Sequence, residues 1–455
     1  MCRQWRSLVF ASRHRLNLRL LCTYGTPVRK TLDCWPPLPI VIRYSDSTGL
    51  RPPSPDDDDN IIAALQHRDR VCEVALTMGS SLFAKLSPLL QKPFPSLESL
   101  TLRPRDNVAL ILPSAFLGTS TPRLRNLYLD AVAPPALPTL LPSSRDLVCL
   151  RLQRVPGNAY IPPDALLASL AATTQLKILC VHFAAQPLPP SYPSTSTAPS
   201  PPARRVVVLP ALSCFEFRGS SEFLEDLVTG IRSAPSLTRT YISLFDQPTF
   251  EIPHFAQFVA RTAAQPIPPC EAKLVLCKDG VFLSLSRLKN GTRMDGREGE
   301  EDASGATEAP HATEECLRLH VSCVQLGRQV PSTAQICRQL SPLLLSGVRK
   351  LEIVASVTPL SPHDVADASQ WVGLFHVFGG VEELHVSYGS VPDVARALQR
   401  VARERVAAEV FPALRELRFD WFASRWEEAV SSFITARQIS GHPPITFHRP
   451  KIALA

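Results

Sequence analysis

The sequence has no long apolar run, no phosphate-binding glycine loop and no compact cysteine framework. No stretch reaches the roughly 18 consecutive apolar residues of a membrane span, so we expect no membrane partner. Neither a GxxxxGK[ST] nor a GxGxxG run occurs, which leaves nucleotide-driven chemistry without support. Twelve cysteines spread over 455 residues are not the pattern of a small disulfide-linked domain. We therefore expect a reduced intracellular protein, in the cytoplasm or the nucleus.

The chain has no net positive charge outside its N-terminal segment. Residues 1–51 carry nine Lys and Arg against two Asp, which accounts for the whole formal charge of +7, and the remainder has 39 residues of each sign. A neutral body lacks the general attraction to phosphate of a nucleic-acid-binding protein, so we expect no nucleic-acid partner. The Arg-rich, acid-free residues 1–32 also fit a mitochondrial presequence by composition.

A leucine pattern recurs along most of the chain. In Leu97-Glu98-Ser99-Leu100-Thr101-Leu102 the leucines fall at positions 1, 4 and 6, and Leu124-Arg125-Asn126-Leu127-Tyr128-Leu129 repeats the spacing. Counting weaker copies, twelve units start 23 to 45 residues apart, which is longer and less regular than the roughly 20 to 29 residues of standard leucine-rich repeats. Spacing of this kind suits a short strand whose inward side chains stack on the next repeat.

Helical patterns fill the intervals between the predicted strands. Expected helices cover about 60–68, 162–175, 221–232, 333–345, 365–378 and 391–410. Strand followed by helix, repeated, predicts an α/β leucine-rich-repeat-like solenoid, a horseshoe with parallel strands on its concave face. Apolar residues make up 45% of the chain, which is enough for such a core.

The expected organisation is an N-terminal cap at 1–50 and an irregular repeat array at 51–455. Two segments poor in core-forming residues interrupt the array as flexible insertions. They are 184–205, rich in Pro, Ser and Thr, and 289–315, rich in Gly and mixed charge.

The candidate reactive residues favour recognition over chemistry. No nucleophile elbow accompanies the histidines at outward strand positions. Cys270 and Cys277, like Cys316 and Cys323, are separated by six residues, whereas zinc knuckles use two to four. We predict no catalytic residue, no metal and no cofactor. Tyr and Arg are enriched at protein contacts, so we expect a partner-binding concave face, although an ordinary polar exposed face fits any single position equally well. That face comprises Tyr128, Arg151, His182, Arg218, Tyr241, His320, His385 and Arg418.

The first residues resemble a known family. Trp5, Leu8 and Val9 fall on one face of a short amphipathic helix, and the run Cys2-Arg3-Gln4-Trp5-Arg6-Ser7-Leu8-Val9 is similar to the last helix of an F-box. With the segments 16–21 and 32–40 and the repeats, the chain resembles fungal F-box proteins with C-terminal leucine-rich repeats, with only the final F-box helix present. The resemblance implies that Trp5, Leu8 and Val9 are the remnant of a site for a Skp-type adaptor.

Two non-enzymatic functions follow. The resemblance implies a substrate receptor of an SCF-type ubiquitin ligase, in which the repeats choose a protein substrate and catalysis belongs to partners. The alternative is a repeat scaffold without a ligase role, because the F-box is incomplete. An enzyme would need a pocket with converging titratable groups.

Overall fold

The computed structural model describes the chain as two compact units. The described residues are 4, 18–44, 54–106, 108–134, 137–157, 160–184, 206–233, 236–262, 268–288, 313–323, 325–355, 367–404, 409–420 and 426–448. The first unit takes residues up to 219 together with 226–237, and the second takes 220–225 and the chain from 238 onward, so helix α7 (Ser221–Gly230) is divided between them. Trp5, Leu8, Val9 and nearly all of both predicted insertions lie outside the described residues.

The first unit is built on eight parallel strands that neighbour one another in chain order. They are β1 (Leu20–Cys22), β2 (Ile40–Tyr44), β3 (Val71–Met78), β4 (Ser99–Pro104), β6 (Asn126–Asp130), β8 (Cys149–Val155), β9 (Ile178–Phe183) and β11 (Cys214–Gly219). Two small parallel pairs accompany them, β5 (Leu110–Ile111) with β7 (Val132–Ala133) and β10 (Val207–Leu209) with β12 (Ile231–Ser233).

The leucine pattern holds these strands in register. Leu100 pairs with Leu127, Leu127 with Leu150, and Leu150 with Leu179, so equivalent positions of successive repeats meet. Each of the four is at most 1% exposed. Burying a Leu side chain contributes roughly 1.5 to 3 kcal/mol, which makes this row a main source of cohesion between repeats.

Short helices connect the strands of the first unit. They are α2 (Val28–Cys34), α3 (Pro55–Gln66), α4 (Ser80–Leu90), η1 (Phe116–Thr119), α5 (Leu137–Leu140), η2 (Leu141–Ser143) and α6 (Pro163–Leu170). The predicted start of α3 at residue 60 is wrong, because Ser54 and Asp57 form a capping box that begins the helix at Pro55. Asp56, Asp57 and Asp58 therefore lie inside the first turn, where the helix dipole favours negative charge.

The second unit also contains eight main strands, but their order breaks the repeat. They are β13 (Arg239–Leu244), β14 (Glu271–Cys277), β15 (Gly280–Leu288), β16 (Thr313–Ser322), β17 (Lys350–Ala355), β18 (Glu383–Val386), β19 (Glu416–Phe419) and β20 (Thr446–His448). Their spatial order is β13-β16-β15-β14-β17-β18-β19-β20, and β15 is antiparallel to both of its neighbours.

The antiparallel strand corrects the expectation of an unbroken parallel series. Its alternating Val281, Leu283 and Leu285 are buried, a period-two pattern that is typical of a strand. A tight turn joins β14 to β15, with Cys277 paired to Gly280. A Cβ atom at Gly280 would lie 2.2 Å from the carbonyl oxygen of Val321, so only glycine fits there.

Longer helices accompany the strands of the second unit. They are α8 (Pro253–Thr262), α9 (Leu326–Leu340), the π-type turn η4 (Ser341–Leu345), α10 (Ala368–Phe375), the 3₁₀ turn η6 (Tyr388–Ser390), α11 (Val391–Arg403) and α12 (Glu427–Ile439). Helix α9 begins earlier than the predicted residue 333. Its first turns are anchored by buried Gln329, whose side-chain nitrogen donates to the carbonyl oxygens of Cys277 at 2.7 Å and Cys323 at 3.0 Å.

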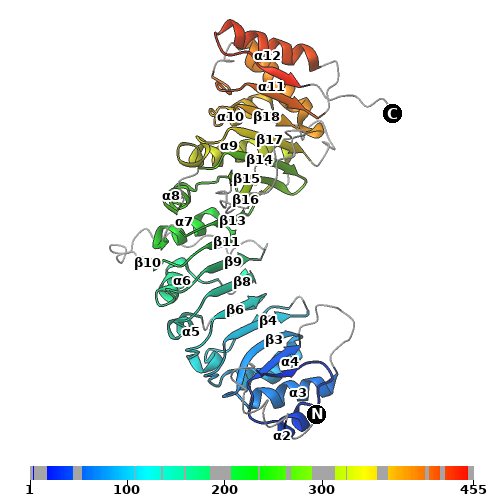
Figure 1. The fold of residues 1–455 in the computed structure, drawn as a ribbon, viewed down its shortest axis with the longest axis vertical. Coiled ribbons are helices and arrows are strands. Elements are labelled where there is room, and N and C mark those ends of the chain that lie inside the picture. The colour runs from blue at the N-terminus through cyan, green and yellow to red at the C-terminus, as the bar shows by residue number, and fades with distance from the viewer. Residues whose placement is uncertain are drawn as a thin grey trace, which may run out of the picture. The chain divides into compact units, whose positions relative to one another are not determined.

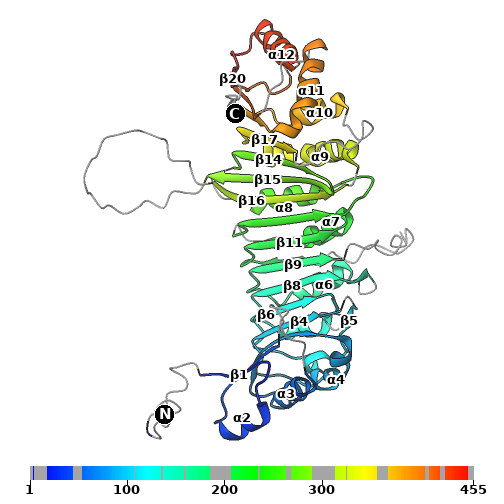
Figure 2. The ribbon, with the colours of Figure 1, turned by 90° about the vertical axis from the view of Figure 1, so that its right-hand side faces the viewer.

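The helices leave one face of the strands open. Within the first unit, α5 and α6 lie on the same side of the strands (Figure 1), and the strands themselves face the viewer in Figure 2. The burial of strand residues alternates accordingly, as in β6, where Leu127 and Leu129 are buried and Tyr128 between them is half-buried. We call the side that carries Tyr128 and its register partners the open face.

The α/β class and the mostly parallel arrangement of strands are confirmed, with the antiparallel β15 as the departure. No helix among the described residues is long and apolar enough to cross a membrane.

Shortening one leucine of the stack tests its contribution to stability. We expect Leu127→Ala to lower the free energy of unfolding by about 2–5 kcal/mol, since the neighbouring strands cannot collapse fully onto the smaller side chain. Urea unfolding followed by circular dichroism measures the change. The adjacent Asn126→Ala is the matched control, because Asn126 is exposed, and we expect a change within about 0.5 kcal/mol. Equal effects of the two substitutions would contradict the stacking argument.

Candidate binding surface on the open face

The strand register gathers four predicted residues of the first unit on one face. Tyr128 pairs with Arg151, Arg151 with Cys180, and Cys180 with Glu216 across β6, β8, β9 and β11. His182 pairs with Arg218 one step further along the same face. Tyr128, Arg151, His182 and Arg218 therefore share one surface, as the alternation of the strand sequences predicts.

A chain of hydrogen bonds crosses the ends of three strands on this face. An Nη atom of Arg103 donates to the hydroxyl oxygen of Tyr128 at 3.0 Å, and that hydroxyl donates to Oε1 of Gln153 at 2.7 Å. Asp130 is 5% exposed, forms an ion pair with Nε of Arg103 at 3.1 Å and accepts a hydrogen bond from Nε of Arg154 at 2.6 Å. One buried carboxylate thus orients two guanidinium groups, each about half exposed.

A cluster of thiol, imidazole and carboxylate lies on β9 and β11, the last two main strands of the first unit. The Cys180 sulfur, a ring nitrogen of His182 and a carboxylate oxygen of Glu216 all lie within 4.8 Å of one another. Oε2 of Glu216 lies 3.6 Å from an Nη atom of Arg151, and the Cys214 thiol donates to Oε1 of Glu216 at 3.6 Å. These are the described residues whose donor atoms could hold a metal ion.

Burial controls protonation in this cluster. Removal from water raises the pKa of the Cys180 thiol, and the charge of Glu216 raises it further. Burial also lowers the pKa of His182. The positive charges of Arg218 and Arg151 lower it further, whereas the charge of Glu216 raises it. At neutral pH we therefore expect a neutral thiol and a neutral imidazole beside one carboxylate.

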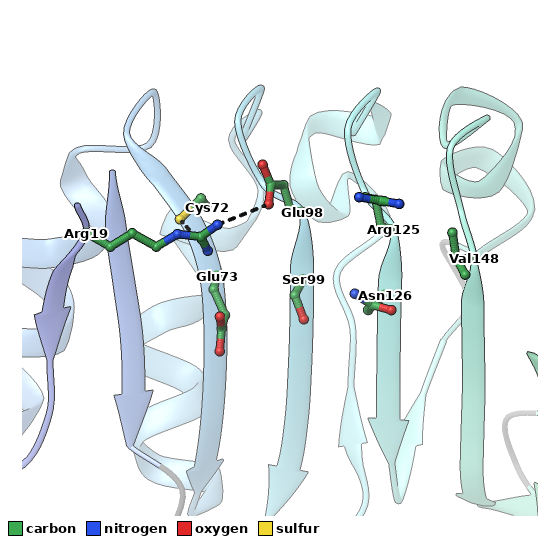
Figure 3. A pocket seen from close by; sticks show the side chains of 8 residues that line it. All are labelled: Arg19, Cys72, Glu73, Glu98, Ser99, Arg125, Asn126 and Val148. Atoms are coloured by element: carbon green, nitrogen blue, oxygen red, sulfur yellow. Dashed lines mark hydrogen bonds and ion pairs between the residues drawn. The ribbon is translucent and has the colours of Figure 1, made fainter. Parts of the chain in front are cut away.

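A shallow pocket of about 310 Å³ lies where the strands of the first unit begin. Figure 3 shows Arg19 reaching across to Cys72 and Glu98, with Ser99 and Asn126 on the following strands. An Nη atom of Arg19 lies 3.8 Å from the Cys72 sulfur, and its other Nη atom lies 3.8 Å from Oε2 of Glu98. Contacts this long in an open pocket contribute little to stability.

The four predicted residues of the second unit form two groups. Nε2 of His385 lies 2.5 Å from Oδ1 of Asp420. His385 pairs in strand register with Arg418. Both line a pocket of about 370 Å³ that also includes Lys350 and His448. A hydrogen bond from Arg418 lowers the pKa of Glu416, a carboxylate that is partly exposed.

The other group lies several strands away. The ring of His320 stacks on Phe282 at a centroid distance of 4.2 Å and lies 3.0 Å from the Ser243 hydroxyl through Nδ1. Tyr241 pairs with the residue two before His320, so these side chains are diagonal neighbours. Strands β15, β14 and β17 separate this group from His385, which the repeat order did not predict.

Sequence reasoning missed Cys180, Asp130 and Arg103 as members of the surface. Cys180 stands between Leu179 and Val181, and a small apolar residue there looks like core. Its outward position in the strand is the signal that was available. The partners of Asp130 come from two other strands, and only the folded register brings them together.

Comparison with models of known protein families found no match, and comparison with curated proteins also found none.

Removing the buried carboxylate tests the network. We expect Asp130→Ala to lower the free energy of unfolding by about 1–3 kcal/mol, because two guanidinium groups lose their acceptor. Asp146→Ala, at an exposed carboxylate, is the control and should change stability by less than about 0.5 kcal/mol. Urea unfolding of both variants measures the change. An unchanged midpoint for Asp130→Ala would show that the network contributes nothing to the free energy of unfolding.

Proposed function

We propose that the chain is a leucine-rich-repeat-like solenoid that binds a protein partner through the open face of its strands. The horseshoe form expected from the sequence belongs to the same proposal. The observation that carries it is the row of Arg, Tyr and His side chains that the strand register places on one face. Tyr and Arg contribute most where proteins contact one another, because they combine apolar area with directional hydrogen bonds.

The charges of the first unit favour a partner with acidic side chains. Between β4 and β11 the open face carries Arg103, Arg151, Arg154 and Arg218 against Asp130 and Glu216. This excess of two positive charges on the face favours the approach of carboxylates from a partner. Bidentate contacts between arginine and carboxylate give both affinity and orientation.

Recognition without catalysis is the role we assign to this surface. Among the described residues, the titratable groups of the open face are engaged mainly in ion pairs along the strands, as in Arg151 with Glu216 and His385 with Asp420. We propose the cytoplasm or the nucleus as the location, consistent with a reduced protein.

The resemblance of residues 2–9 to an F-box helix supports a narrower role. We propose a substrate receptor of an SCF-type ubiquitin ligase, with Trp5, Leu8 and Val9 contacting a Skp-type adaptor. The alternative is a scaffold that binds its partner through the same face and recruits no adaptor. The two differ in one measurable property, which is adaptor binding.

Co-purification of the full chain with a purified Skp-type adaptor separates the two roles. We expect a stable complex that Trp5→Ala weakens at least about tenfold, since an aromatic anchor of an interface contributes upwards of about 1.4 kcal/mol. Trp35→Ala is the matched control, because Trp35 is an about half-exposed tryptophan that lies outside the proposed helix. Absence of any complex would reject the ligase role and leave the scaffold.

Charge reversal on the open face tests partner recognition separately. We expect Arg151→Glu with Arg218→Glu to abolish capture of the partner in proximity labelling while adaptor binding stays unchanged. Arg123→Glu with Arg145→Glu, at exposed positions off the strands, is the charge-matched control. Loss of the same captured proteins in both double variants would contradict recognition by the open face.

A further inference from the structure

We propose that Cys180, His182 and Glu216 bind one Zn²⁺ on the open face of the first unit. The three donor atoms come from neighbouring strands β9 and β11 and lie within 4.8 Å of one another. This inference is independent of the partner and of the ligase role.

The donor set selects zinc among the common divalent ions. Mg²⁺ and Ca²⁺ prefer oxygen ligands, whereas a thiolate, an imidazole and a carboxylate together suit Zn²⁺. Zinc sites with three protein ligands leave a fourth position for water or an incoming group.

The spacing of the donors is close to that of a tetrahedral site. Zinc–ligand distances of about 2.0–2.3 Å place tetrahedral ligand atoms about 3.5 Å apart. The donors, within 4.8 Å of one another, therefore need to close by no more than about 1.3 Å, which side-chain rotation on fixed strands can supply. The strand pairing holds Cys180 of β9 opposite Glu216 of β11, and His182 lies two residues after Cys180 on β9.

An unpartnered buried nitrogen supplies a second observation. Nε2 of His182 is inaccessible to solvent and has no hydrogen-bond partner among the described residues. Leaving a polar atom buried without a partner is unfavourable, and a metal ion would satisfy it. Neutral imidazole is the form that coordinates zinc.

The surrounding groups resemble the outer contacts of metal sites. Arg151 lies 3.6 Å from Oε2 of Glu216 and the Cys214 thiol donates to Oε1, so the carboxylate is oriented from both sides. Such outer contacts fix the direction of ligands and affect metal affinity. With the metal bound, thiolate and carboxylate together balance the charge of Zn²⁺.

Binding exchanges a proton for the metal. The S–H bond of Cys180 breaks, a sulfur–zinc bond forms, and the proton passes to the buffer, so one proton is released for each Zn²⁺ bound. No electron is transferred and no co-reactant is required.

Zinc titration of the full chain tests the proposal. The protein is prepared reduced and treated with a chelator, and Zn²⁺ alone is added in competition with a chromophoric zinc indicator. We expect one Zn²⁺ per chain whose binding Cys180→Ala and His182→Ala each weaken at least about a hundredfold, since even outer-contact losses cost about 10- to 100-fold. Zinc-edge X-ray absorption should then report sulfur, nitrogen and oxygen neighbours together.

The control distinguishes this cluster from the other thiols of the chain. Cys72→Ala removes a buried thiol beside an arginine and a glutamate, in a pocket that no histidine lines, and we expect it to leave zinc affinity unchanged. Circular dichroism establishes that each variant is folded, and Cys180→Ser with His182→Gln offers a milder pair if either alanine variant unfolds. Absence of stoichiometric binding, or retention of full affinity by the folded Cys180 or His182 variants, would overturn the proposal.

Discussion

The in-register contact of buried leucines between neighbouring parallel strands is the interaction on which the rest of the first unit depends. Leu100, Leu127, Leu150 and Leu179 each pack at the equivalent position of the adjacent repeat. Because side chains alternate along a strand, fixing these residues inward also fixes Tyr128, Arg151 and Cys180 outward. A shift of one residue in any strand would bury the polar row and expose the leucines.

The two units use this constraint differently. In the first, every main strand neighbours its successor, so the polar side chains of the open face form one continuous network around Asp130 and Glu216. In the second, the antiparallel β15 separates β16 from β14, and the polar residues form two groups, one at His320 and one at His385. Continuity of the register therefore governs how far charged groups on a face can interact.

Glu216 links the two roles proposed for the open face of the first unit. Its carboxylate lies beside Arg151, which we assign to partner recognition, and beside Cys180 and His182, which we assign to zinc. One carboxylate therefore serves both as the ion-pair partner of Arg151 and as a proposed metal ligand.

The sequence by itself determined the positions of the repeat strands such as β4, β6 and β8, the α/β class and the outward placement of residues such as Tyr128 and Arg151, because apolar spacing directly reports which side chains must leave water. Only the tertiary structure decided where α9 begins, that β15 runs antiparallel, and that Cys180, His182 and Glu216 meet. These outcomes depend on contacts between residues distant along the chain: Gln329 is fixed by the carbonyls of Cys277 and Cys323, and Asp130 by two arginines from other strands. The apolar spacing within one strand carries no information about such partners, because several registers between strands are compatible with the same spacing until the strands pack.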